Sequence, residues 1–559
     1  MSTHARPLAD RLAGASDALL ERMLRLRAVR ADVDWADFFD AAEGLLEPGS
    51  VSYALSTLTR EQALELRAAS AGLPADTADL DVLGLIDSTG RVPQPVVEAV
   101  SAQPEISDAA PQPAEAASDA VAARAAERAF TTISSLADLL LAARTAPLAL
   151  VSTGALSATE KRRLDDDGAL DALRELAELT GLARPVDREL RVTAEAADWL
   201  AAPFAQRWAQ VVDAYRAALP DGIRSAQRWG DEQAWAVVHP WDPAWPDRAL
   251  RLRAHAARLG LIAGDGSEPE WTAQVRAGDP ADASALQALL PTEVDRVFLQ
   301  NDLSAIAPGP LLPALDNRLR AMTEQDSAAS ASSYRFTMDS VARSMVEGET
   351  AASILDFLRE VSLTDVPQPL EYLVAQTAAR HGLVRVGPDS TGGTTVSSTD
   401  DHLLEAIAVD RNLRPMGLVR DGDHLTSRVS AETVAWALTD ARYPATLVDR
   451  DGATVAAARN RVAPTNADDS PSYAPLIARL RSRQGPDADA AWLDRELEAA
   501  VRARAVVLVE VAMPDGSSRE LTLEASGIGG GRLRGRDRAA DVERTLPVRS
   551  IRSVRVLQG

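Results

Sequence analysis

The chain has 559 residues, of which 59 are basic and 82 acidic, giving a formal net charge of −23. A protein of this length holds about three to five domains. Its negative charge repels nucleic acid and anionic membranes, so any contact with DNA requires a local basic patch. The absence of cysteine excludes disulfides, thiolate zinc sites and cysteine nucleophiles. No apolar run has the length of a signal peptide or a membrane span, and we expect a cytoplasmic protein with no membrane contact.

The first predicted domain covers residues 1–100 and is mostly helical. Ser16 and Thr59 each precede a segment with helical apolar spacing, in the position of an N-terminal cap. "LDVLGLIDSTGRVPQPVVEAVS" (80–101) follows, with an apolar run, a Ser-Thr-Gly turn and a return segment. Helices followed by a small hairpin are typical of a winged helix.

A linker is predicted over residues 101–120, which are rich in Ala, Pro, Ser and acid. Residues 121–215 then repeat the order helix, strand, helix, helix, hairpin, with Ser157 as a helix cap, and indicate a second winged-helix domain. Residues 216–285 are predicted to form a Trp-rich helical unit. Seven of the ten tryptophans lie between Trp199 and Trp271. Because basic residues are sparse among them, we expect core packing rather than base stacking.

The motifs of several enzyme classes are missing. A P-loop needs a lysine followed by Ser or Thr, and the single lysine, Lys161, precedes an arginine and follows no glycine-rich turn. GxSxG, HExxH and EF-hand patterns are also absent. The six histidines occur singly, without a partner at metal-ligand spacing: His4, His239, His255, His381, His402 and His424. We therefore expect no catalytic residue, no cofactor and no metal.

Residues 286–460 contain the most specific pattern. "RVFLQNDLSAIAPGPL" (296–311) ends an apolar strand in a polar turn, where Asn301 and Asp302 suit an Asx turn better than a catalytic site. Downstream, Thr337 and Thr350 are predicted helix caps. The segments "YRFTMDSVARSMVEGETAASILDFLREVS" and "VPQPLEYLVAQTAARHGLVRV" resemble the N-terminal domain of the XPB/Ssl2 helicase family, in the stand-alone, helicase-associated form of actinobacteria. In those helicases two ATPase lobes follow, and their motifs do not follow here. The resemblance implies a module that contacts a helicase partner or DNA.

A second linker is predicted over residues 461–490, with one helix near 473–483, followed by a β-rich C-terminal domain at 491–559. This last domain resembles a WYL domain, an Sm- or SH3-like barrel linked to bacterial regulators and to nucleic-acid or nucleotide ligands. The tripeptide that names that family is absent, and "GGRLRGRD" occupies its place.

Charge distinguishes this C-terminal domain from the rest of the chain. Residues 501–559 contain 11 arginines and 7 acids, a net charge of +4, which leaves 48 basic and 75 acidic residues elsewhere, a net charge of −27. Arg532, Arg534, Arg536 and Arg538 alternate with other residues, and we expect them in a glycine-flanked turn. Arginine donates two hydrogen bonds to one phosphate, so these four are the candidate nucleic-acid-binding residues. A solvated arginine-rich loop accounts for them equally well.

Together these features predict an α+β protein with tandem winged-helix units, an XPB N-terminal-like domain and a small C-terminal barrel. The leading hypothesis is a non-catalytic accessory protein of DNA repair or transcription that contacts an XPB-type helicase and, through the barrel, DNA. The alternatives are a pure protein-interaction scaffold and a ligand-responsive WYL-type transcriptional regulator.

Overall fold

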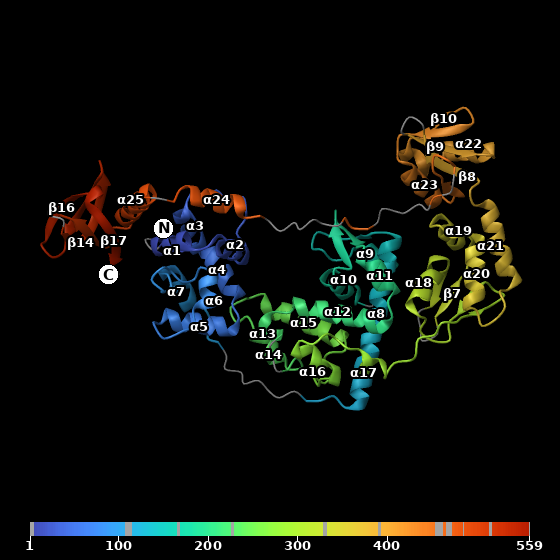
Figure 1. The fold of residues 1–559 in the computed structure, drawn as a ribbon, viewed down its shortest axis with the longest axis horizontal. Helices are drawn as coiled ribbons and strands as arrows, with labels where there is room; N and C mark the ends of the chain where they lie inside the picture. The colour runs from blue at the N-terminus through green and yellow to red at the C-terminus, as the bar shows by residue number, and fades with distance from the viewer. Residues whose placement is uncertain are drawn as a thin grey trace. The chain divides into compact units, whose positions relative to one another are not determined.

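The computed structural model describes residues 5–106, 115–164, 168–224, 228–327, 332–389, 393–452, 455, 462–464, 472–484, 486–513 and 517–557. The fold is mixed α+β, about half helical, with four small sheets in the described residues, which confirms the predicted class. The chain divides into two compact units (Figure 1). Unit 1 contains residues 1–113, 220–253 and 466–559, and unit 2 contains residues 114–219 and 254–465.

Unit 1 begins with seven helices. They are α1 (Ala5–Gly14), α2 (Asp17–Leu26), α3 (Phe38–Leu46), α4 (Pro48–Thr57), α5 (Arg60–Ser70), α6 (Ala78–Val82) and α7 (Gln94–Ser101). Ser16 caps α2, and Thr59 forms a capping box with Gln62 at the start of α5, as the sequence predicts.

The hairpin predicted within residues 80–101 is wrong, because residues 5–106 contain no strand. The Asp87 carboxylate accepts hydrogen bonds from the backbone N–H groups of Thr89 and Arg91, at 2.8 and 3.1 Å, and folds the Ser-Thr-Gly segment into a tight turn. Pro93 then occupies the N-cap position of α7, so too few residues remain between the turn and the helix for a return strand.

The core of these helices is completed from distant parts of the chain. Trp241, from the middle segment that carries α13 (Asp221–Arg224), α14 (Glu232–Ala236) and the start of α15 (Trp245–Arg258), packs into it. Two C-terminal helices, α24 (Ala474–Ser482) and α25 (Pro486–Arg502), overlap the range predicted as a linker. The same core buries five side chains from these helices and the residue before them: Tyr473, Leu476, Ile477, Leu480 and Trp492.

The C-terminal domain of unit 1 is a five-stranded antiparallel sheet covered by α25 (Figure 1). Its strands are β13 (Val506–Ala512), β14 (Ser518–Gly529), β15 (Arg532–Asp537), β16 (Val542–Pro547) and β17 (Ile551–Leu557), in the order β16-β15-β14-β13-β17. A 3-10 turn, η2 (Val548–Ser550), joins the last two strands. In the described residues the edge strands β16 and β17 do not pair with each other, so the sheet is open rather than the predicted closed barrel.

Unit 2 begins with the long helix α8 (Asp119–Thr145), followed by β1 (Leu148–Ala149), α9 (Ala158–Arg163), α10 (Leu170–Leu179) and the hairpin of β2 (Ala183–Val186) and β3 (Glu189–Val192). The strand order is β1-β3-β2. This is the element order that the sequence predicts for residues 121–215. Four more helices follow: α11 (Glu195–Ala201), α12 (Phe204–Ala218), α16 (Glu270–Ala277) and α17 (Ser284–Gln287).

All seven tryptophans between Trp199 and Trp271 are buried. Each indole N–H donates to a backbone carbonyl, at 2.6–3.3 Å. Buried tryptophan normally satisfies its N–H in this way, and the prediction of core packing is confirmed. Trp229, Trp235, Trp241 and Trp245 belong to unit 1, whereas Trp199, Trp208 and Trp271 belong to unit 2.

The rest of unit 2 contains two neighbouring hydrophobic cores. The first lies under the sheet β4-β5-β7-β6. Its elements are β4 (Phe298–Leu299), β5 (Ser304–Ile306), α18 (Pro313–Ala321), β6 (Glu324–Ser327), β7 (Ser333–Arg335), α19 (Met338–Val346), α20 (Ala351–Val361) and α21 (Gln368–Arg380). Thr337 and Thr350 form capping boxes at α19 and α20, as predicted.

The second core lies under the sheet β10-β11-β9-β8-β12, in which β12 runs parallel to β8. Its elements are β8 (Val384–Pro388), β9 (Thr394–Ser398), α22 (Asp401–Val409), η1 (Arg411–Met416), β10 (Val419–Asp421), β11 (His424–Ser427), α23 (Ala431–Asp440) and β12 (Ala445–Leu447).

Candidate nucleic-acid interface

The sheet that carries the predicted arginines is built from alternating sequence. Alternate residues of β13 and β15 are buried, because successive side chains of a strand point to opposite faces. Gly530 and Gly531 connect β14 to β15 with φ angles of 59° and 71°, the two positive values that a type I′ hairpin turn requires. This turn fixes the register in which Arg532 lies opposite Gly529.

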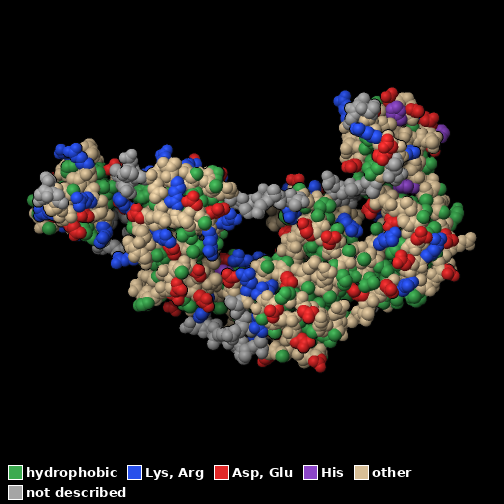
Figure 2. All heavy atoms as spheres, in the orientation of Figure 1, with side chains coloured by type: hydrophobic (Ala, Val, Ile, Leu, Met, Phe, Trp, Pro, Cys, Tyr) green, Lys and Arg blue, Asp and Glu red, His purple; other side chains and the backbone are tan. Residues whose placement is uncertain are grey.

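Arg532, Arg534 and Arg536 lie on β15 and Arg538 follows it, so the prediction that they occupy a turn is wrong. They are exposed, whereas the intervening Leu533, Gly535 and Asp537 are buried. Arginine recurs at every second residue here because this segment is a strand whose other face packs into the core, and not because it forms the glycine-flanked turn that we expected. The first three arginines therefore form a row on the outer face of the sheet, and Figure 2 shows basic side chains over this part of unit 1.

The members of the row differ in their charge environment. Both Nε and Nη2 of Arg536 lie 2.7 Å from Asp541, and its neighbours across the sheet are Glu524 and Glu543. Arg532 and Arg534 form no ion pair within the described residues, and their cross-strand neighbours carry no charge: Gly529, Pro547, Gly527 and Thr545. Arg536 is thus neutralised locally, and the positive potential of the row comes from Arg532 and Arg534.

A partly buried ion pair holds the end of β15 in place. Arg544 on β16 donates to Asp537 at 2.6 Å, and Asp537 also accepts from the backbone N–H groups of Ala539 and Ala540. The hydrogen bond from Arg544 holds the pKa of Asp537 below its usual value. Arg544 therefore serves the fold, and it does not add to the free positive charge of the sheet.

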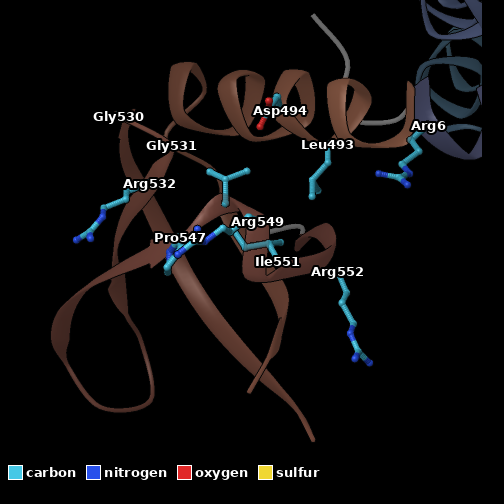
Figure 3. Close-up of a pocket in the computed structure, with 11 residues that line it drawn as sticks. Arg6, Leu493, Asp494, Gly530, Gly531, Arg532, Pro547, Arg549, Ile551 and Arg552 are labelled. Carbon is cyan, nitrogen blue, oxygen red and sulfur yellow. The ribbon is translucent and has the colours of Figure 1, made fainter. Parts of the chain in front are cut away.

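Sequence reasoning missed two further arginines at the same end of the sheet. Arg549 in η2 and Arg552 on β17 are exposed, and with Arg532 they line a cavity of about 680 Å³ (Figure 3). The signal was present as "VRSIRSV" (548–554), where the two arginines recur at a spacing of three. The residue pattern alone does not specify that β15 and β17, which are separated in the sheet by β14 and β13, line the same cavity.

The structure also places the other residues that the sequence analysis singled out. Asp302 accepts hydrogen bonds from the backbone N–H and hydroxyl of Ser304, at 3.1 and 2.5 Å, and forms the expected turn. Lys161 lies 2.5 Å from Asp171. Across the described ranges, no group of three or more His, Asp or Glu side chains could hold a metal ion. A search of the same ranges for a helix long and apolar enough to cross a membrane found none.

Helix α10 of the second predicted winged unit lacks a basic face. Its one arginine, Arg174, is buried and surrounded by Asp171, Glu175 and Glu178, with its shortest ion pair, to Glu178, at 2.6 Å. Glu175 on this helix also lies 3.1 Å from His255 of α15, measured from its Oε2 to the histidine Nε2. A helix with this acidic surface repels a phosphate backbone.

Comparison with known families gives one match. Residues 297–421, from β4 to β10, match a family model described as "Helicase conserved C-terminal domain". These residues contain all the buried side chains of the first core of the preceding section and about half of those of the second. The match indicates a helicase-related domain and a helicase-related role for this part of the chain. A comparison with curated proteins found no match.

Proposed function

We propose that this chain is a non-catalytic, helicase-associated accessory protein that acts in DNA repair or transcription in the cytoplasm. The observation that carries the proposal is the helicase-related match over residues 297–421, in a chain whose only lysine, Lys161, is bound to Asp171 outside any glycine-rich loop. This range overlaps the segment that resembles the XPB/Ssl2 N-terminal domain. A helicase in trans would supply the ATPase that this chain lacks.

The strand orders support the finer domain assignments. The order β1-β3-β2 with α8, α9 and α10 is compatible with a winged helix at residues 121–215. The order β17-β13-β14-β15-β16, preceded by α25, supports an Sm- or SH3-like domain of the WYL type at the C-terminus. The acidic surface of α10 favours protein contact over DNA contact for the winged unit.

Contact with nucleic acid is assigned to the C-terminal sheet. Its outer face carries Arg532 and Arg534 without neutralising partners in the described residues, whereas residues 1–500 have a net charge of −27. A ligand-responsive regulator is a second candidate, and the observation that favours it is the cavity beside Arg532.

The proposal is tested by affinity purification of the full-length chain from its native cytosol. An XPB-type helicase should co-purify, and deletion of residues 290–390 should abolish its recovery. The purified chain alone should neither bind nor hydrolyse ATP, with or without DNA. ATP hydrolysis that follows the pure protein and survives Lys161→Ala would contradict the non-catalytic assignment. Undiminished recovery of the helicase after the deletion would place the contact elsewhere.

A further inference from the structure

A cavity in unit 2 lies where the core under the sheet β4-β5-β7-β6 meets the core under the sheet β10-β11-β9-β8-β12. Helix α19 joins these two cores (Figure 1), because Met345 is buried in the first and Val346 in the second. His381, at the end of α21, lies 3.1 Å from Thr446 on β12, measured from Nε2 to Oγ1. The cavity beside these contacts has a volume of about 420 Å³, within the range of about 300–1,000 Å³ that is typical of ligand pockets.

The apolar part of the cavity lining comes from both cores. Helix α19 contributes Met338, Ala342 and Val346, which recur every four residues and so share one face of the helix. The second core contributes Trp436 on α23 and Tyr443 after it, both half-buried and packed against that core. A lining of this kind suits a molecule with an apolar or aromatic body.

The charged side chains of the lining favour an anion. Three arginines that line the cavity form no ion pair among the residues that the structure describes: Arg343, Arg380 and Arg442. Two acids of the lining, Glu347 and Asp440, already interact with other residues of the chain. His381 adds no positive charge near neutral pH, because burial lowers its pKa. Asp339 is the remaining acid of the lining, so three available positive charges face one negative charge.

Two of the arginines lie along the same wall. Arg380 extends from α21 to α19, where its Nη1 lies 3.3 Å from the Sδ of Met338. A thioether sulfur is a weak acceptor, so this guanidinium keeps donors for a ligand. Arg343 is half-buried and lies five residues after Met338 on α19, about 7.5 Å along the helix axis. The long side chains of Arg343 and Arg380 can therefore meet on one carboxylate.

We propose that this cavity binds a small carboxylate with an apolar body, the carboxylate on Arg343 and Arg380 and the body against Trp436 and Tyr443. The inference goes beyond the proposed function, because contact with a helicase or with nucleic acid does not require this ligand. Asp339 lies in the first turn of α19 and forms no ion pair in the described part of the chain, so it can receive the ammonium group of an amino acid. The carboxylate is the feature that an organic acid and an amino acid share.

The test measures binding of phenylpropanoate, phenylpropylamine and phenylalanine to the full-length chain by calorimetry. Phenylpropanoate should bind at least about tenfold more tightly than phenylpropylamine, because only the anion can accept hydrogen bonds from the guanidinium groups. Arg343→Gln combined with Arg380→Gln should weaken phenylpropanoate about tenfold or more. The matched control is Arg411→Gln with Arg414→Gln, which removes the same charge from exposed residues outside the cavity. The control should change the affinity by less than about threefold.

Two further variants locate the ligand and identify its source. Phenylpropanoate should change the tryptophan fluorescence of the wild type, and Trp436→Phe should abolish that change while it keeps an aromatic side chain in the lining. Asp339→Asn should strengthen phenylpropanoate binding about two- to fivefold, a gain that misfolding cannot produce. Phenylalanine that binds more tightly than phenylpropanoate, with the advantage lost in Asp339→Asn, would identify an amino acid as the ligand. Weaker binding of phenylalanine would identify an organic acid without the ammonium group.

Four outcomes would overturn the inference. They are the absence of phenylpropanoate binding, equal affinity for phenylpropylamine, equal losses in the arginine variant and its control, and a fluorescence change that persists in Trp436→Phe. Equal affinity for the amine would show that the sign of the charge does not matter, and a persistent fluorescence change would place the ligand outside this cavity.

Discussion

Neighbouring acids, rather than the number of arginines, determine which side chains of β15 can bind phosphate. Arg534 and Arg536 are both exposed and two residues apart. Arg536 contacts Asp541 and lies between two glutamates, whereas Arg534 lies between a glycine and a threonine. A phosphate has to displace an existing ion pair at Arg536, whereas at Arg534 it meets a guanidinium that has no ion pair among the described residues.

This difference predicts distinct salt dependences for single-residue variants. If Arg532, Arg534, Arg549 and Arg552 engage phosphates, the log–log salt slope of binding to single strands should be about −3, so affinity falls roughly fiftyfold between 50 and 200 mM salt. Arg534→Gln should make the slope less steep by about 0.7. Arg536→Gln should leave it unchanged, because a guanidinium already paired to Asp541 neutralises no phosphate and therefore releases no counterion from the strand.

The measurement is binding of labelled oligonucleotides by the full-length chain and the two variants across a salt series. Equal slopes for Arg534→Gln and Arg536→Gln would show that the ion pair with Asp541 does not protect Arg536 from phosphate. Circular dichroism of both variants serves as the control for folding, since both side chains are exposed and neither contributes to the core.

A buried carboxylate makes stability depend on pH near neutrality. Glu496 on α25 is only 6% exposed and lies 3.5 Å from Arg6 on α1. Burial raises its pKa to about 7, against the lowering effect of Arg6. The carboxyl group of Glu496 holds its proton more tightly in the folded protein than in the unfolded chain. Protonation of Glu496 therefore contributes fully to the free energy of unfolding below about pH 4.5, and this contribution is lost as the pH rises through about 7. The loss amounts to about 3 kcal/mol.

Glu496→Gln should remove this pH dependence. The free energy of unfolding of the wild type relative to the variant should fall by about 2.5 kcal/mol between pH 5 and pH 8, as measured by denaturant titration at each pH. Other titrating groups are common to both proteins and cancel in the difference. Glu498→Gln on the exposed side of α25 is the control and should give a constant difference. A constant difference for Glu496→Gln as well would mean that Glu496 is ionised throughout this range.

At the scale of elements, polar side chains join α8 to the domain that contains the helicase-related match. Arg320 on α18 donates to Asp138 on α8 at 2.5 Å and to Asp316 at 3.0 Å. Asp316 also accepts a 2.6 Å hydrogen bond from the hydroxyl of Tyr334 on β7. The charges of Asp138 and Asp316 raise the pKa of Arg320 against the lowering effect of burial, and burial together with the neighbouring Asp316 raises the pKa of Tyr334. One guanidinium thus compensates two carboxylates from different elements.

Arg320→Ala should destabilise unit 2 by about 2–3 kcal/mol, somewhat less than the 3–5 kcal/mol of a fully buried pair, because Arg320 keeps part of its contact with water. Arg359→Ala is the matched control, since its pair with Asp356 is exposed and should cost less than about 1 kcal/mol. Thermal unfolding of the two variants checks the ranking. Equal costs would mean that water replaces the guanidinium at Asp138 and Asp316.

Local chemistry determined which elements could be predicted. The caps at Ser16, Thr59, Thr337 and Thr350 require only residues within one helical turn, and all four are present. The hairpin expected within 80–101 fails for an equally local reason, since Asp87 closes a tight turn instead. The arginines of β15 were assigned to a turn because glycines flank them, although their alternation already indicated a strand.

Non-local pairing accounts for what the sequence could not reveal. The cavity beside Arg532 forms because α25, β15 and β17 meet at one end of the sheet, and no residue pattern encodes that meeting. The tryptophans were correctly expected in a core, but their distribution over two units depends on contacts across long stretches of chain.

At the scale of the whole molecule, unit 1 is assembled from three separate stretches of sequence. Its N-terminal helices share one core with Tyr473, Leu476, Ile477, Leu480 and Trp492. The Tyr473 hydroxyl donates to the carbonyl of Val29 at 2.7 Å, and Arg481 donates to Asp17 at 3.1 Å. Burial of a large apolar side chain contributes about 1.5–3 kcal/mol, so these five residues contribute on the order of 10 kcal/mol, as much as the net stability of a typical domain.

A fragment of residues 1–106 should therefore fail to fold cooperatively by itself, although it contains seven helices. Addition of a peptide spanning residues 472–502 should restore helical content and a cooperative melting transition, because the peptide supplies the missing side of the core. The same peptide with Ile477→Asp is the control and should restore neither, since it places a charge among buried leucines. Circular dichroism of the fragment, with and without each peptide, gives the answer. A cooperative transition in the fragment alone would show that the N-terminal helices are an independent domain and that α24 and α25 only cover it.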